Sequence, residues 1–234
     1  MPQLVPPVVT ALPRAAARAA GEGLAGVTRA VAALRPGAKP LHPAGTVVRG
    51  RLTRHGASDG APPTGVDLLD RPGEGEVVVR LSRAVGLPHP VPDVWGLALR
   101  LQHEGETGDL LLASTGWRGP LRHVLVPRWE GSDRPLTTLL PYRTPTGPVL
   151  IGARSTDQQE DGAVQRWTLS WARGLGPWHA FADLEIEHPV GDALDGEDEE
   201  IEFDPVLHQV SGLRQYPTVR RLRRPAYRTA QRTH

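Results

Sequence analysis

The chain has 234 residues and a formal net charge of +1, so its overall charge gives no reason to expect a nucleic-acid partner. It contains no cysteine, which excludes disulfides, iron–sulfur clusters, thiolate metal sites and a cysteine nucleophile, and suits a reducing cytoplasm. No apolar run approaches the roughly 20 residues that a membrane span needs. Arg14 and Arg18 interrupt the start of the chain, which is not typical of an export signal. We therefore expect one cytoplasmic domain with a hydrophobic core and no membrane partner.

The first part of the chain has a helical pattern. Within residues 8–35, Ala and Arg separate apolar residues at helical spacing, and Pro36 ends the pattern. The apolar residues are Leu24, Val27, Val31 and Leu34. This predicts an N-terminal helical arm over residues 1–38 that packs on the domain or on another subunit of a homo-oligomer. Residues 39–234 then form the main domain.

From Thr46 onward the pattern changes to strands. Short runs rich in Val, Leu and Thr alternate with clusters of Gly, Pro and Asp. The runs that we interpret as strands are 46–54, 76–85, 95–102, 109–115, 121–128, 148–156, 164–172 and 178–187. Many successive strands at this spacing predict a mostly β fold, an antiparallel barrel or sandwich. We expect the stretch 55–76, with its Gly, Pro and Asp residues, to be a surface loop.

Four segments in chain order carry a more specific signal. LHPAGTVVRG at 41–50 places Gly45 and Gly50 three and eight residues after His42. The other three are VVVRLSRAVG at 77–86, DVWGLALRLQHEGETGDLLLA at 93–113 and HVLVPR at 123–128. Together they resemble the core of the haem catalase family. The resemblance implies a catalase-like antiparallel eight-stranded β-barrel with an N-terminal helical arm and a short C-terminal helix.

The resemblance also implies roles on the distal side of a b-type haem. His42 matches the distal histidine, which moves a proton between the oxygens of peroxide, and Ser82 matches the serine that fixes the tautomer of that histidine. Arg80 matches an arginine that pairs with a haem propionate. Lys39 stands where the family has a second such arginine. A lysine keeps the positive charge but lacks the planar guanidinium that can bind a carboxylate with two parallel hydrogen bonds.

The iron ligand is open between three readings. Tyr227 follows Arg223 by four residues, the spacing of the family's phenolate ligand and its arginine. Tyr216-Pro217 is similar to the Tyr-Pro after that ligand, but Gly212 occupies the arginine position. In a third alignment, residues 202–231 match an earlier family segment and the sequence stops before the ligand. We take Tyr227 as the metal ligand, with Arg223 beside it.

One departure from the family pattern bears on activity. The distal asparagine of catalases falls at Ala113, and Ser114 should point to the opposite face of its strand. The sequence therefore predicts a haem-binding oxidoreductase that uses peroxide more as a peroxidase does than as a true catalase. The alternative is a haem-free barrel that binds or hydrolyses a small anionic substrate through Arg80 and His42.

Overall fold

The computed structural model describes residues 44–58, 60–84, 90–103, 105–129, 135–156, 164–187, 201 and 203–217. The expected N-terminal arm, its boundary with the main domain and the expected C-terminal helix lie outside these residues. The elements are β1 (Ala44–His55), α2 (Asp67–Asp70), β2 (Pro72–Arg83), β3 (Trp95–His103), β4 (Glu106–Ser114), η1 (Gly119–His123), β5 (Leu136–Thr137), β6 (Tyr142–Thr144), β7 (Gly147–Ser155), β8 (Val164–Ala172) and β9 (Trp178–Glu187). Among the described residues, no helix is both long and apolar enough to cross a membrane.

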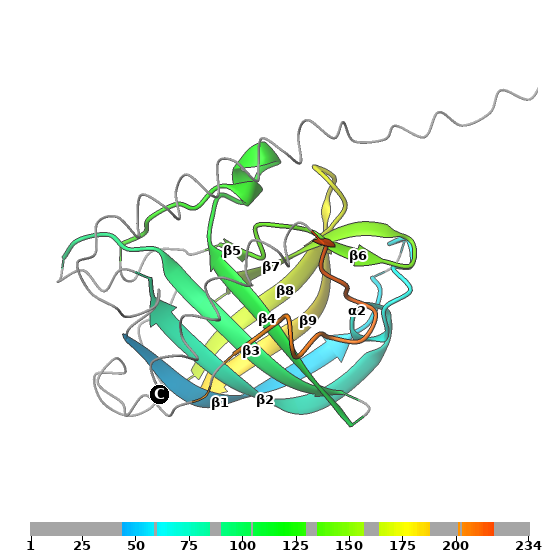
Figure 1. Ribbon diagram of the computed structural model, residues 1–234, viewed down its shortest axis with the longest axis horizontal. Coiled ribbons are helices and arrows are strands. Elements are labelled where there is room, and N and C mark those ends of the chain that lie inside the picture. Colours follow the sequence, from blue (N-terminus) through cyan, green and yellow to red (C-terminus); the bar gives the residue numbers. More distant parts are fainter. Residues whose placement is uncertain are drawn as a thin grey trace, which may run out of the picture. The chain divides into compact units, whose positions relative to one another are not determined.

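The strands form a closed antiparallel barrel (Figure 1). Their order is β5-β4-β3-β2-β1-β9-β8-β7-β6, and a further pairing joins β5 to β7. This pairing closes a ring of eight strands and leaves β6 as a flap on β7. The predicted eight-stranded antiparallel barrel is therefore confirmed.

The barrel wall has an inner and an outer side because successive residues of a strand point in opposite directions. In β3, Leu97, Leu99 and Leu101 are buried in the core, so the residues between them face outward. Their partners Val77 and Val79 in β2 belong to the same core. The alternation fixes which side chains of each strand are available on the outer surface.

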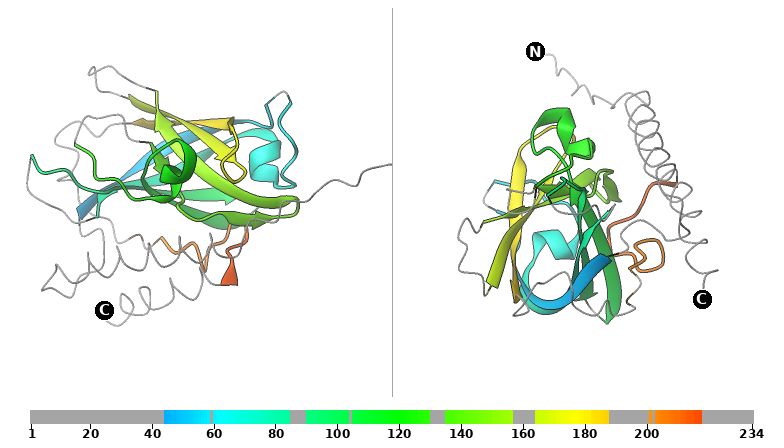
Figure 2. Two further views of the ribbon diagram at one scale, coloured as in Figure 1. Left: turned by 90° about the horizontal axis from the view of Figure 1, so that it is seen from above. Right: turned by 90° about the vertical axis from the view of Figure 1, so that its left-hand side faces the viewer.

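Residues 55–76 do more than cover the surface. Val66, Leu68 and Leu69 join the hydrophobic core, and Figure 2 shows α2 within the ring of strands. The carboxylate of Asp70 holds this segment by accepting hydrogen bonds from the backbone N–H and the hydroxyl of Thr64. The expectation of a simple surface loop is wrong here, because its few apolar residues fill one opening of the barrel.

The prediction of a strand at 121–128 is also wrong. The short 3₁₀ helix η1 occupies the start of this segment, and only isolated bridges from Leu125 and Arg128 follow. Leu121 and Val124 are 56% and 48% exposed, so their spacing does not mark a buried strand face. The barrel strand in this part of the chain is the two-residue β5.

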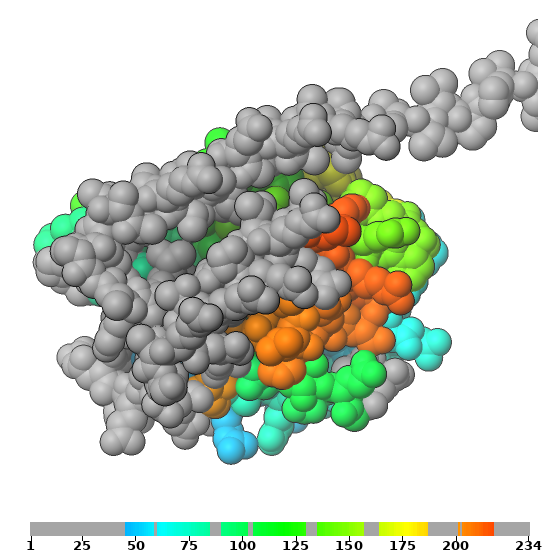
Figure 3. All heavy atoms as spheres, viewed as in Figure 1, coloured from blue at the N-terminus to red at the C-terminus, as the bar shows by residue number. Residues whose placement is uncertain are grey.

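A segment after the barrel packs on its outer wall. The buried carboxylate of Asp109 accepts hydrogen bonds from Nε and Nη2 of Arg100, each at 2.8 Å. It also accepts a hydrogen bond from the backbone N–H of Asp204 at 2.8 Å. The hydrogen bond to Asp109 raises the pKa of Arg100. Nδ1 of His208 lies 3.1 Å from the same carboxylate. Figure 3 shows residues 203–217, in orange, seated against the green strands.

Candidate functional site

The candidate site lies on the outer wall of β2, β3 and β4. Arg80 and Ser82 are two residues apart in β2 and alternate with the inward Val79 and Leu81, so both face outward. Ser82 pairs with Gly45 of β1 on one side and with Gly96 of β3 on the other. The two side chains therefore share a surface with the strand that follows His42 in the sequence.

Most of the side chains around Ser82 on this surface are small. Gly96, Ala98 and Ala113 face outward there, with the larger Leu111 opposite Ala98, and Ser82 and Ala98 are only 5% and 8% exposed. A Cβ on Gly45 would lie 2.8 Å from Cζ of Arg80, so the guanidinium extends over this glycine. The result is a mostly uncharged area with one guanidinium on it. We call these seven residues the β2–β4 platform.

The wall formed by β1, β9 and β8 is different. Glu76, Arg51, Glu185 and Arg166 pair in register from strand to strand, so opposite charges alternate across the barrel surface. Nε of Arg166 lies 3.0 Å from Oε1 of Glu185, and both side chains are half exposed. This charged ladder is a solvated face, which distinguishes the platform as the part of the wall suited to a flat apolar group.

Ala113 and Ser114 have opposite orientations, as the alternation predicts. The hydroxyl of Ser114 donates to the carbonyl of Val126 at 2.8 Å and accepts from the backbone N–H of Trp95 at 3.1 Å. Ser114 is fully buried by these contacts and is not available on the platform. On this strand, the platform has only the methyl group of Ala113 beside Gly96.

The remaining predicted site residues are Lys39, His42, Arg223 and Tyr227, which all lie outside the described residues. The structure therefore brings together Arg80 and Ser82 alone from the predicted set. Of the described tyrosines, Tyr142 is buried at the barrel core and Tyr216 is half buried. The described residues contain no group of three or more His, Asp or Glu side chains that could hold a metal ion.

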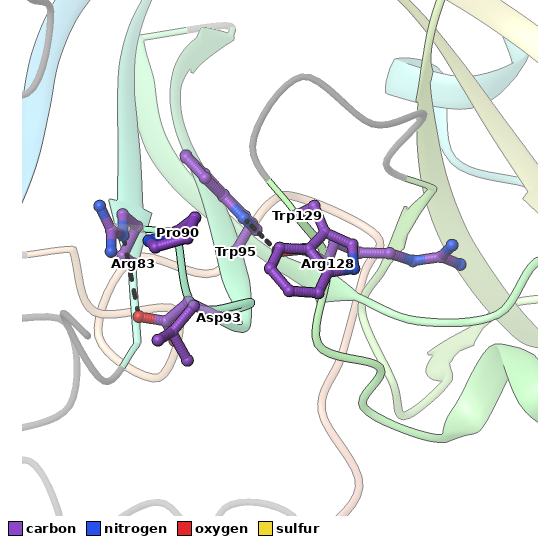
Figure 4. Close-up of a pocket in the computed structure, with 7 residues that line it drawn as sticks. Arg83, Pro90, Asp93, Trp95, Arg128 and Trp129 are labelled. Carbon is purple, nitrogen blue, oxygen red and sulfur yellow. Dashed lines mark hydrogen bonds and ion pairs between the residues drawn. The ribbon is translucent and has the colours of Figure 1, made fainter. Parts of the chain in front are cut away.

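A pocket that was not predicted from the sequence lies at the end of β2, near the start of β3. Arg83, Pro90, Val91, Asp93, Trp95, Arg128 and Trp129 line a half-open cavity of about 120 Å³. Figure 4 shows the Arg83–Asp93 ion pair on one side of it and the Trp129 ring on the other. The neighbouring residues Arg128 and Trp129 were only a weak indication of a binding site, because the sequence does not show that they lie near Arg83.

A second missed feature is the buried cation Arg122. Its Nη1 donates to the carbonyls of Gly174 and Gly176 at 3.1 Å, and its Cζ lies 4.6 Å from the ring centre of Trp178. Trp178 stacks on Trp117 with a centroid distance of 4.2 Å. Burial lowers the pKa of Arg122. These contacts pin η1 to the turn between β8 and β9, which is a structural function.

Comparisons with known proteins agree with the fold. A bacterial catalase matches with a TM-score of 0.57 and 15% identity, covering 97% of this chain and 61% of the catalase. A fungal catalase matches with a TM-score of 0.53 and 12% identity, covering 93% of this chain and 62% of that one. No family model and no curated protein matches the sequence. The chain thus has a catalase-like fold and spans less than two thirds of the length of these catalases.

Proposed function

We propose that this chain is a haem-binding, peroxide-using oxidoreductase that works more as a peroxidase than as a catalase. The observation that carries the proposal is the β2–β4 platform, with Arg80 and Ser82 on one outer surface of a catalase-like barrel. We also propose that it acts in the cytoplasm on small peroxides, without nucleic-acid or membrane partners, and that its N-terminal arm supports a homo-oligomer.

The platform fits a haem in shape and in charge. Haem is a flat, largely apolar ring with two carboxylates at one edge, and Gly96, Ala98, Leu111 and Ala113 offer it small or apolar side chains on one face. The guanidinium of Arg80, which extends over Gly45, offers the planar fork that suits a carboxylate. The described part of the site is therefore compatible with the group.

Other residues of this chain would complete the site. In the proposal, Lys39 and Arg80 bind the propionates, and Tyr227 provides a phenolate to the iron. A phenol has a pKa near ~10 when free, and the guanidinium of Arg223 beside it would stabilise the charged form. The bound haem would supply the redox chemistry that the side chains of this chain lack.

The proton transfer belongs to His42 and Ser82. His42 would take a proton from one oxygen of peroxide and return it to the departing oxygen, for which an imidazole with a pKa near ~6.5 is suited. The hydroxyl of Ser82 would hold the imidazole in the tautomer that leaves one ring nitrogen free to accept the proton. Ala113 gives no amide to polarise peroxide, which is why we expect oxidation of small donors to exceed dismutation.

Haemin titration of the full chain tests the proposal. Ala98→Phe places a ring on the platform and should prevent haemin uptake, as followed by the Soret band. Thr53→Phe, on the outer wall of β1 beside Asp183 and Glu74, is the matched control and should bind as the unmodified protein does. Melting temperatures of both variants show whether each is folded. If both variants take up haemin equally, haem does not bind at the platform.

The alternative is a haem-free barrel that binds or hydrolyses a small anion through Arg80 and His42. It is favoured by the absence of an amide at Ala113. A protein that takes up no haemin, yet shows Arg80-dependent binding of inorganic phosphate, would support this alternative.

A further inference from the structure

The pocket at the end of β2 has one aromatic wall and one ionic wall. Trp129 is 58% exposed, and Pro90 and Val91 also line the pocket and add apolar surface. On the other side, Nε of Arg83 lies 3.8 Å from Oδ2 of Asp93. Figure 4 shows these side chains around the opening. The pocket therefore offers a stacking surface opposite a polar edge.

The size of the pocket limits its occupant to about one ring. A cavity of about 120 Å³ is somewhat smaller than the roughly 150 Å³ cavity that holds benzene in an engineered protein. Because the pocket is half open, one edge of a ring can protrude into solvent. A fused or extended aromatic ligand does not fit inside it.

The charges around the pocket select against an ionic ligand. The Arg83 cation is already close to the Asp93 anion, and its Cζ lies 5.9 Å from the ring centre of Trp95. The guanidinium of Arg128 points away from Arg83 and Asp93 in Figure 4 and donates to the carbonyl of Thr115 at 3.2 Å. A ring with a neutral hydroxyl can hydrogen-bond to the ion pair without adding a net charge.

We propose that this pocket binds a small neutral phenol, which stacks on Trp129 and directs its hydroxyl toward the Arg83–Asp93 pair. The assignment of this phenol as the reducing substrate rests on the proposed function. Arg83 follows Ser82 in β2, so the pocket lies one residue from the platform along the strand, on the opposite face of the wall. In the overall reaction, two phenols each give one electron and one proton to hydrogen peroxide, which yields two phenoxyl radicals and two waters.

Binding is tested first, on the full chain without added haemin. The probe is 4-fluorophenol, followed by its fluorine NMR shift and line width. We expect saturable binding with a dissociation constant on the order of 1 mM, as for a small ligand in a shallow site. Trp129→Ala should weaken binding at least fivefold, and Trp129→Phe should restore part of it. Leu207→Ala, an equally exposed apolar truncation, should change nothing.

Two results of this binding experiment would overturn the site. One is equal binding by the unmodified protein and Trp129→Ala, with both proteins folded by their melting temperatures. The other is equal or tighter binding of 4-fluorobenzoate, which would contradict the selection of a neutral ring.

The donor role is tested separately, with the haemin-loaded protein and peroxide. Trp129→Ala should raise the KM for the phenol with little change in kcat, and an unchanged KM would contradict the donor role. A protein that binds the phenol but takes up no haemin would overturn the proposed function and support the pocket as a phenol site.

Discussion

Ser82 of β2 and Ala113 of β4 face the same side of the barrel wall, because both pair with Gly96 of the strand between them. The hydroxyl of Ser82 and the methyl group of Ala113 thus belong to one surface, with a glycine between them. In the proposed function, this relationship connects the sequence of β4 to the balance between donor oxidation and peroxide dismutation.

Ala113→Asn should increase oxygen evolution from peroxide. The added amide would face the platform and could polarise the peroxide, and one preorganised donor typically contributes about 100-fold or more in rate. An oxygen electrode measures the change in the haemin-loaded protein. Thr53→Asn on the solvated wall is the control and should have no effect. Unmodified protein that already evolves oxygen at full catalase rates would show that the distal pocket is misplaced.

His42→Ala should abolish both peroxide dismutation and donor oxidation, because no other group of the proposed site can shuttle the proton. His55, which lies on the solvated wall 2.7 Å from Asp183, is the matched control. His55→Ala should leave both activities unchanged. Stopped-flow measurement of peroxide consumption compares the two variants, and activity retained in His42→Ala would exclude this histidine.

Asp109→Asn should reduce the free energy of unfolding by about 3 kcal/mol, since it leaves Arg100 without its buried counter-charge. The loss would also loosen the segment that begins at Phe203, whose backbone is tied to the same carboxylate through Asp204. Urea unfolding gives the energy. Asp183→Asn breaks an exposed pair and should cost under about 1 kcal/mol. If the two variants lose similar free energies of unfolding, the buried Arg100–Asp109 pair is not the stabilising contact.

Arg122→Ala should destabilise the protein by about 2 kcal/mol, through loss of the hydrogen bonds to Gly174 and Gly176 and of the contact with Trp178. Burial lowers the pKa of Arg122, so the folded state binds its proton less tightly than the unfolded state. Burial therefore disfavours the charged form of Arg122. Its titration raises the free energy of unfolding only at the high pH at which arginine loses its proton. The difference between variant and parent should be constant from about pH 6 to about pH 9. A slope there would point to another titrating group.

Strands with regular alternation were predictable from the sequence. The runs at 164–172 and 178–187 match β8 and β9 at both ends, because Trp167, Leu169 and Trp171 alternate with polar residues over the whole strand. The orientation of Arg80 and Ser82 followed from the same period of two. Alternation within one strand can be seen in the sequence without knowledge of the contacts between distant segments.

Features that depend on distant contacts were not predictable. β5 has only two residues, too few for a pattern, yet its pairing with β4 and β7 closes the barrel. The segment 121–128 has several apolar residues, but its start belongs to a 3₁₀ helix that has Pro120 in its first turn, and Leu121 is exposed. The pocket beside Arg83 joins residues up to 46 positions apart, Arg83 and Trp129, so only the fold brings them together.

Haem binding is tested most directly by the absorption spectrum of the full chain after expression with added haem precursor. We expect a Soret band, equimolar iron, and loss of both in Tyr227→Phe, with Tyr216→Phe unchanged. A purified chain that stays colourless and takes up no haemin would contradict haem binding.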